Sequence, residues 1–541
     1  MPLNKIQLKA EIFRIINPIR NLNAVDDKII SSTLYKLKSI KDADFEFIAR
    51  ILIKEADTSF PKAAGAFLHM AENLSPESFI PLMFNELNSP KTSDARKIFF
   101  LNALSGFGVK FDPEDIGEYL NNPDEVINNE TLKFLENAKS DPEAQIDFLD
   151  FYFTSGEEDK RELINSVVHD FEGDELINIL SPLVLSEDDI SIMDFCLDIM
   201  QKQKSLMSIK PLKYLTNLDT VPEIKSKAHK ILQKMTLQGF YTKEKLSKFY
   251  RELLSDFNEP SALISLPDGN SNFSVAISRK TKTGACFVFF TAVNIELGPF
   301  SAFGFSSLTE SDYNLIIKRF FNLSQHFSIP PKGAKTILNS LLVKRIALNK
   351  IVPYEYYPWE RLLDDIETDA RPLDEMLVDG IEIFEIDKEK SRLINNSPFF
   401  ENWFYRYSKN APYFVILMNK VLKLNKNNIQ NIENLILETL SDKNLISNIK
   451  NRLKFLSYCL NAGGLSDLAS LHYSVIFNEK EFTSLVSDIL KRSIYEFALI
   501  LNTPKKTGNN MFKKTLSSIE DKNKASVIIN YIEENWLGNG T

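Results

Sequence analysis

The sequence predicts a mainly α-helical fold: an irregular α-solenoid of stacked antiparallel helix pairs, interrupted by one small α+β module with a three-stranded antiparallel meander, and followed by a second helical region. Two observations favour this fold. Apolar residues recur at helical spacing along most of the 541 residues, whereas residues 261–305 contain alternating, β-branched and turn-forming residues. Because one hydrophobic core rarely grows beyond about 250–300 residues, we expect several domains.

The helical spacing is clear where it can be followed over several turns. Ala228, Ile231, Leu232 and Met235 line one face of a helix, and a longer stripe of the same kind runs over 482–497. In a strand, where side chains alternate with a period of two, such residues would point to both faces. The two segments are therefore predicted to be helices.

Helix starts are marked by a capping residue, a proline and an acid. Examples are Ser75-Pro76-Glu77 and Asp141-Pro142-Glu143. The capping side chain can accept from free backbone N–H groups, proline loses no hydrogen bond at the first helical position, and the acid is favourable near the positive end of the helix dipole. Such starts indicate many short helices joined by short polar loops.

A succession of short helices predicts stacked pairs, since one pair cannot bury its apolar face alone. In this respect residues 1–257 resemble the HEAT and armadillo-like α-solenoids. The resemblance implies a helical-repeat domain with an extended surface for binding proteins. An irregular globular helical domain is the alternative.

Residues 258–352 are predicted to form the α+β module. Its three strands are expected at about 263–266, 273–278 and 285–293, with a turn at 267–270. Helices over 310–323 and 332–349 should cover the sheet, because three strands alone are not stable. Residues 353–394 are then predicted to be an aromatic and acidic linker, and 395–541 a C-terminal helical domain.

Charge is segregated on either side of residue 354. Residues 313–354 hold seven bases and no acid, and 355–389 hold thirteen acids and three bases. The basic stretch and the aromatic loop after it are the predicted partner-binding site, since such side chains can grip a peptide or stack on bases. The candidate residues are Lys332, Lys335, Lys344, Arg345, Lys350, Tyr354, Tyr356, Tyr357 and Trp359.

Two other interpretations of this stretch stay open. The bases can pair with the acidic segment 355–389 inside the molecule, and the aromatic rings can pack in the core. Reversing the charges of Lys344 and Arg345 together distinguishes internal pairing from partner binding, because only pairing contributes to stability.

No residue is predicted to be catalytic, to bind a metal or to hold a cofactor. The five histidines are scattered, and Cys196, Cys286 and Cys459 are far apart in apolar surroundings, which indicates buried small side chains. Asp268 at the predicted turn and the acids near 364–369 are attributed to turn formation and to a solvated loop.

The predicted function is a non-enzymatic protein-interaction scaffold whose partner is another protein or a peptide. One alternative is an enzyme with its site in the α+β module, acting on a nucleotide or nucleic acid. Another is nucleic-acid binding through 313–354, which the net charge of −9 opposes. The start of the chain lacks the apolar segment of a signal peptide, and no long apolar run exists, so we expect a soluble, cytoplasmic protein without a membrane partner.

Overall fold

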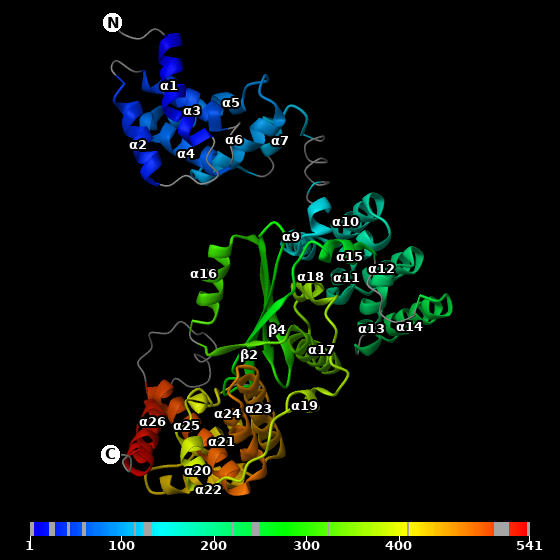
Figure 1. Ribbon diagram of the computed structural model, residues 1–541, viewed down its shortest axis with the longest axis vertical. Coiled ribbons are helices and arrows are strands. Elements are labelled where there is room, and N and C mark those ends of the chain that lie inside the picture. Colours follow the sequence, from blue (N-terminus) through cyan, green and yellow to red (C-terminus); the bar gives the residue numbers. More distant parts are fainter. Residues whose placement is uncertain are drawn as a thin grey trace. The chain divides into compact units, whose positions relative to one another are not determined.

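The computed structural model consists of two compact units, residues 1–133 and 134–541, each described by itself below (Figure 1). This boundary falls inside the segment 1–257, which was predicted to be one helical domain. The described residues are 5–20, 27–40, 44–56, 61–112, 115–123, 133, 135–218, 221–240, 248–322, 324–407, 411–502 and 519–537.

In its described residues, the regular secondary structure of the first unit is helical, apart from the turns and loops that join the helices. Its helices are α1 (Lys5–Arg20), α2 (Asp27–Lys38), α3 (Phe45–Ala56), α4 (Pro61–Leu74), α5 (Pro76–Leu87), α6 (Asp94–Gly106) and α7 (Ile116–Tyr119). Consecutive helices pack as pairs, α1 with α2, α3 with α4 and α5 with α6, and neighbouring pairs contact each other. Large apolar side chains such as Phe67, Phe79 and Phe100 fill the space between them.

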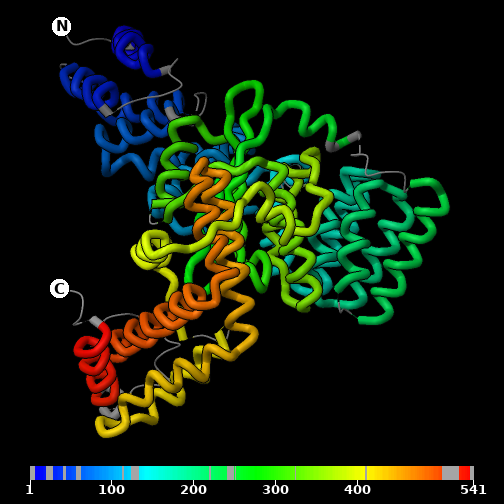
Figure 2. The backbone as a smooth tube through the Cα atoms, turned by 60° about the horizontal axis from the view of Figure 1, so that its bottom comes forward, coloured from blue at the N-terminus to red at the C-terminus, as the bar shows by residue number. Residues whose placement is uncertain are grey.

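The second unit begins with another set of helix pairs. They are α9 (Pro142–Thr154), α10 (Glu157–Asp170), α11 (Gly173–Ser186), α12 (Ile190–Gln203), α13 (Ile209–Asn217) and α14 (Pro222–Leu237), followed by α15 (Lys248–Leu254). The predicted start at Asp141 is confirmed, because its carboxylate accepts from the backbone N–H of Glu143 at 2.8 Å. α11 contacts both α9 and α13, and α12 contacts α14, so that α11–α14 lie side by side (Figures 1 and 2).

Among the described residues the β structure gathers in one five-stranded antiparallel sheet, so the prediction of a mainly α protein with a small α+β module is confirmed. The strands lie in the order β4-β3-β2-β1-β5. They are β1 (Ser261–Ser265), β2 (Asn272–Lys280), β3 (Cys286–Asn294), β4 (Gly298–Leu308) and β5 (His326–Ile329). The predicted three-stranded meander covers β1, β2 and β3, and its strand number is wrong because β4 and β5 extend the sheet at both edges.

β4 and β5 were not predicted, because neither has a clear strand pattern in the sequence. In β4, glycine occupies position 304, where a side chain would overlap the ring of Trp359, so the expected alternation of large and small residues is broken. β5 has only four residues, too few to show a period, and it forms because it pairs with β1. Both strands therefore depend on tertiary contacts.

Helices cover both faces of the sheet (Figure 1). α17 (Pro331–Ala347) and α18 (Tyr356–Glu360) pack on the face that bears Phe273, Val275 and Phe289. α16 (Glu310–Phe320) packs on the smaller apolar area around Phe290 on the other face. The two cover helices were predicted within three residues of their ends, but α18 belongs to the core although its residues were assigned to a linker.

The remaining helices form the C-terminal part of the second unit. They are α19 (Leu373–Met376), α20 (Lys388–Asn395), α21 (Pro412–Val421), α22 (Ile432–Thr439), α23 (Lys443–Ala462), α24 (Ser466–Ser474), α25 (Glu479–Asn502) and α26 (Ile519–Ile532). Figure 2 shows α26, in red, beside α25, which it contacts. α23 also reaches β5 of the sheet. In the described part of the chain, no helix has the length and apolar character needed to cross a membrane.

Candidate functional site

Three of the four aromatic side chains that were predicted to bind a partner lie in the core. Tyr356, Tyr357 and Trp359 are buried, with Tyr356 packed edge-on against Phe289 at 5.5 Å between ring centroids. Because these rings cover the sheet, they cannot contact a partner, and their prediction as binding residues is wrong. Tyr354 is half-buried: it packs on Phe153 of α9 and donates its hydroxyl hydrogen bond to Asp150.

The predicted basic residues are spread over different environments. Lys335 is half-buried and donates to the backbone oxygens of Asp364 and Ile366 at 3.3 and 2.5 Å. Burial lowers the pKa of the Lys335 ammonium. Lys332 and Lys350 are exposed. Only part of the basic stretch therefore meets the acidic segment 355–389.

Lys344 and Arg345 face the turn between β3 and β4. Lys344 pairs with Glu296 at 2.7 Å, and Arg345 donates to the backbone oxygens of Leu297 and Ile351 at 3.2 and 2.6 Å. Their partners are thus mostly outside the acidic segment. Lys335, Lys344 and Arg345 therefore make separate contacts within the fold, whereas Lys332 and Lys350 stay exposed.

The double variant Lys344→Glu/Arg345→Glu should lower the free energy of unfolding by about 1–2 kcal/mol, since it removes one half-buried ion pair and the bonds to the carbonyl oxygens of Ile295, Leu297 and Ile351. The loss should shrink at high salt, which screens the repulsion from Glu296. Urea denaturation at two salt concentrations measures both effects. The exposed Lys350→Glu is the control and should change stability by less than about 0.5 kcal/mol. An unchanged double variant would contradict this account.

A buried ionic cluster joins the helix pairs to the sheet. Glu360, only 3% exposed, accepts from Lys210 at 3.0 Å and from the hydroxyl of Tyr214 at 3.2 Å. Lys210 also pairs with Asp364 at 3.1 Å, whereas Asp365 pairs with Arg279. Glu360 and Asp364 thus share Lys210, whereas Asp365 has a separate partner in Arg279. Among the described residues, no group of His, Cys, Asp and Glu is placed to hold a metal ion.

Glu360 should make stability depend on pH. Burial raises the pKa of its carboxyl from the ordinary value of 4.5, despite the opposing effect of Lys210. Folding is therefore favoured by the protonated form: this contribution is complete below pH 4.5 and is lost as the pH rises through the raised pKa. Glu360→Gln, which stays neutral, should become progressively more stable relative to the native chain over that window. Unfolding free energies measured across the window would contradict the prediction if the difference fell with pH.

The predicted turn is confirmed and leaves no free carboxylate at its tip. Asp268 accepts from the backbone N–H groups of Asn270 and Asn272, both at 2.8 Å. The cysteines at 196, 286 and 459 are buried, as predicted, and burial raises the pKa of the Cys196 thiol to about 12. These groups serve the fold.

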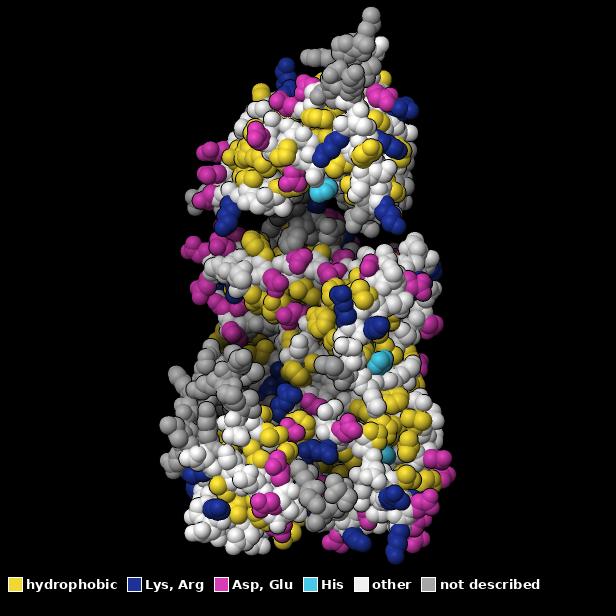
Figure 3. Space-filling view, turned by 90° about the vertical axis from the view of Figure 1, so that its left-hand side faces the viewer, with side chains coloured by type: hydrophobic (Ala, Val, Ile, Leu, Met, Phe, Trp, Pro, Cys, Tyr) yellow, Lys and Arg dark blue, Asp and Glu magenta, His cyan; other side chains and the backbone are white. Residues whose placement is uncertain are grey.

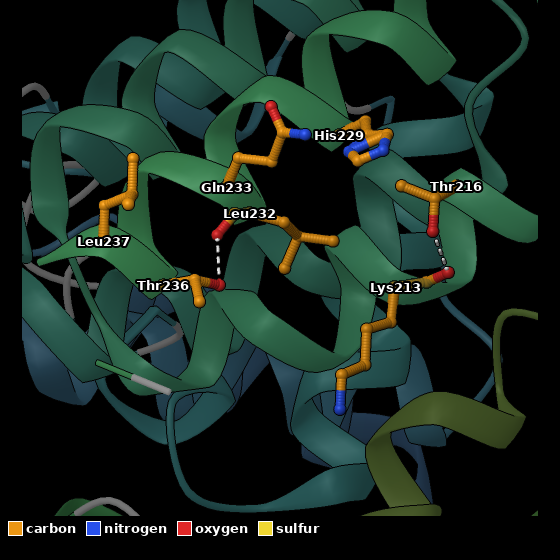
Figure 4. Close-up of a pocket in the computed structure, with 7 residues that line it drawn as sticks. All are labelled: Lys213, Thr216, His229, Leu232, Gln233, Thr236 and Leu237. Atoms are coloured by element: carbon orange, nitrogen blue, oxygen red, sulfur yellow. Dashed lines mark hydrogen bonds between the residues drawn. The ribbon is translucent and has the colours of Figure 1, made fainter. Parts of the chain in front are cut away.

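The candidate site is an open groove between α13 and α14, which we call the α13–α14 groove. Its volume is about 510 Å³, and it is lined by Lys213, Thr216, His229, Leu232, Gln233, Thr236 and Leu237 (Figure 4). The repeat of lining residues every three or four positions places them on one side of α14, opposite its buried stripe at 228, 231 and 235. The groove lies where a further helix pair would pack if the set continued.

Apolar and polar groups are both available in the groove. Leu237 is 89% exposed and Leu232 is half-buried. The hydroxyls of Thr216 and Thr236 donate to Lys213 O and Leu232 O within their own helices, both at 2.8 Å (Figure 4). The amide of Gln233 and the ring of His229 are exposed beside them. The groove can therefore hold an apolar side chain and accept hydrogen bonds at its rim.

A local excess of lysines in the sequence indicates this site, although the prediction did not use it. Residues 209–240 hold six lysines and two acids, within a longer segment that is acidic in total. Lys225, Lys230 and Lys234 are exposed on α14. By contrast, the face of the second unit drawn in Figure 3 bears interspersed acidic, basic and apolar side chains. A charge count helix by helix would have found the basic helix.

Comparisons with known proteins give no relative for this chain: no family model, no curated protein and no solved structure matches it significantly.

Proposed function

We propose that this chain is a non-enzymatic protein-interaction scaffold that works in the cytoplasm. The observation that supports it best is the α13–α14 groove, which combines an exposed leucine, a half-buried leucine and a lysine-rich rim at the end of a set of packed helix pairs. Apolar contacts surrounded by polar groups are typical of protein-binding surfaces. The three buried free thiols fit a reducing compartment.

We further propose that the helix pairs of both units are HEAT-like repeats of an irregular α-solenoid. The pattern that supports this is the contact of each pair with the next within each unit, with α11 between α9 and α13. In such stacks each pair buries its apolar face on its neighbours and leaves an extended surface for partners. The inner helices α9, α11 and α13 contact α17 or α18, so partners would use the remaining sides.

Affinity capture with the full-length chain, followed by lysine cross-linking and mass spectrometry, tests the scaffold. We expect partner peptides to be cross-linked to Lys225, Lys230 or Lys234 on α14. Lys423 and Lys426, exposed in the C-terminal part, serve as internal controls for nonspecific reaction. Failure of any protein to remain bound through washing, or cross-links spread evenly over all exposed lysines, would reject the proposal.

A further inference from the structure

We infer that the α13–α14 groove binds an acidic amphipathic helix of a partner protein. The inference rests on the proposed scaffold function and names the kind of partner that this surface fits. The groove lies between two helices at the end of a set of packed pairs, and a third helix is the element that would continue such packing. The apolar face of an incoming helix would cover Leu232 and Leu237, and its acidic side chains would meet the lysines.

The positions of the groove residues match a helical partner. From Lys225 to Leu237, α14 rises about 18 Å, which corresponds to about three turns of a helix lying along it. Leu232 lies in the middle of this length and Leu237 at its end, so the groove offers two apolar contacts separated by about one and a half turns. Peptide helices that bind grooves present apolar anchors at positions i, i+3, i+4 and i+7, about one to two turns apart, and this range includes the separation of the two leucines.

The charge of the rim selects an acidic partner. Lys225 lies one turn before His229 on the groove side of α14, and Lys230 is three residues before Gln233. Lys225 and Lys230 are exposed, whereas Lys227 is already paired with Asp194 and Asp198 of α12 at 2.6 and 2.8 Å. The two exposed ammonium groups would be complemented by carboxylates of the incoming helix.

A protein partner is favoured over nucleic acid by the composition of the groove. Its lining contains no Phe, Tyr, Trp or Arg, the large planar side chains on which single-stranded bases stack, and its one ring is the small imidazole of His229. The lining contains two leucines, and covering them with apolar side chains of a partner would contribute favourable free energy of binding. The net charge of −9 also repels a polyanion at long range.

Fluorescence anisotropy with the full-length chain tests the inference. The probe is a fluorescein-labelled peptide of about 15 residues made of Glu, Ala and Leu, long enough to form a helix on binding, with leucines three or four positions apart. The double variant Lys225→Glu/Lys230→Glu should weaken its binding about tenfold or more, because attraction is replaced by repulsion at both positions. Leu237→Ser should weaken it as well. Since all three side chains are exposed, the variants should melt at the native temperature.

The double variant Lys423→Glu/Lys426→Glu is the matched control, because it changes the net charge equally at exposed positions outside the groove. It should change the dissociation constant of the peptide by less than about twofold, since only charges far from the groove change. The inference is overturned if the peptide does not bind, if both double variants weaken it equally, or if a labelled oligothymidine binds the groove in its place. Partner cross-links that persist in the Lys225→Glu/Lys230→Glu variant would overturn the groove assignment and leave the scaffold proposal standing.

Discussion

Gly269→Val should lower the free energy of unfolding of the second unit by about 3 kcal/mol or more, because it forces backbone apart in a packed junction. Gly269 lies at the tip of the β1–β2 turn, where its N–H donates to Asn402 O at 2.9 Å. A Cβ at this position would overlap the backbone N, C and O of Phe404. Because backbone atoms cannot turn aside as a flexible side chain can, the sheet must separate from the C-terminal helices. Urea denaturation followed by circular dichroism measures the loss.

Gly156→Ala is the control for the loss of glycine in the same unit. Gly156 is the N-cap residue of α10, and a Cβ there would meet only the flexible carboxylate of Asp159, at 3.3 Å. The substitution should cost less than about 1 kcal/mol. If Gly269→Val were as mild as this control, the close approach of the turn to Phe404 would be disproved.

Arg452→Ala should destabilise the same junction by about 3–5 kcal/mol, since it leaves a cavity and removes two charged hydrogen bonds. The Arg452 side chain, on α23, is fully buried. It donates to Gly269 O at 2.8 Å and to the hydroxyl of Tyr405, and its guanidinium carbon lies 4.8 Å from the ring centroid of Trp403. One side chain thus joins the turn, α23 and the segment before α21.

Arg452→Lys separates the contribution of the guanidinium from that of charge alone. Lysine keeps the positive charge, but it lacks the planar group that stacks on Trp403 and donates to two acceptors at once. It should therefore recover only a small part of the lost stability in the same urea series. Native stability of either variant would show that the junction does not depend on this side chain.

The basic stretch shows why the predicted binding site differed from the groove. A count of charges along the chain shows that 313–354 lacks acids, but not where each side chain points. Lys335 is turned inward to the carbonyls of Asp364 and Ile366, and Trp359 is turned into the sheet. Their exposure is decided by helices and strands from other parts of the chain.

In contrast, part of the groove could be predicted from the sequence. The stripe at Ala228, Ile231, Leu232 and Met235 was predicted, and three of these residues are buried. Leu232 is the exception: it is half-buried and lines the groove together with His229. The sequence alone does not show that α14 is the last helix of its set. Without knowledge of this place in the set, the lysines of α14 cannot be distinguished from those on any exposed helix face.

The sequence by itself determined the helical class, the place of the sheet, the start of α9 and both ends of α17, because these depend on local periodicity and on caps within a few residues. Only the tertiary structure decided the division after Lys133, the edge strands β4 and β5, and the burial of Trp359. Each of these depends on contacts between residues far apart in the chain. The free energy that stabilises these contacts comes from the complementary shape and the burial of both contacting segments, which neither segment specifies alone.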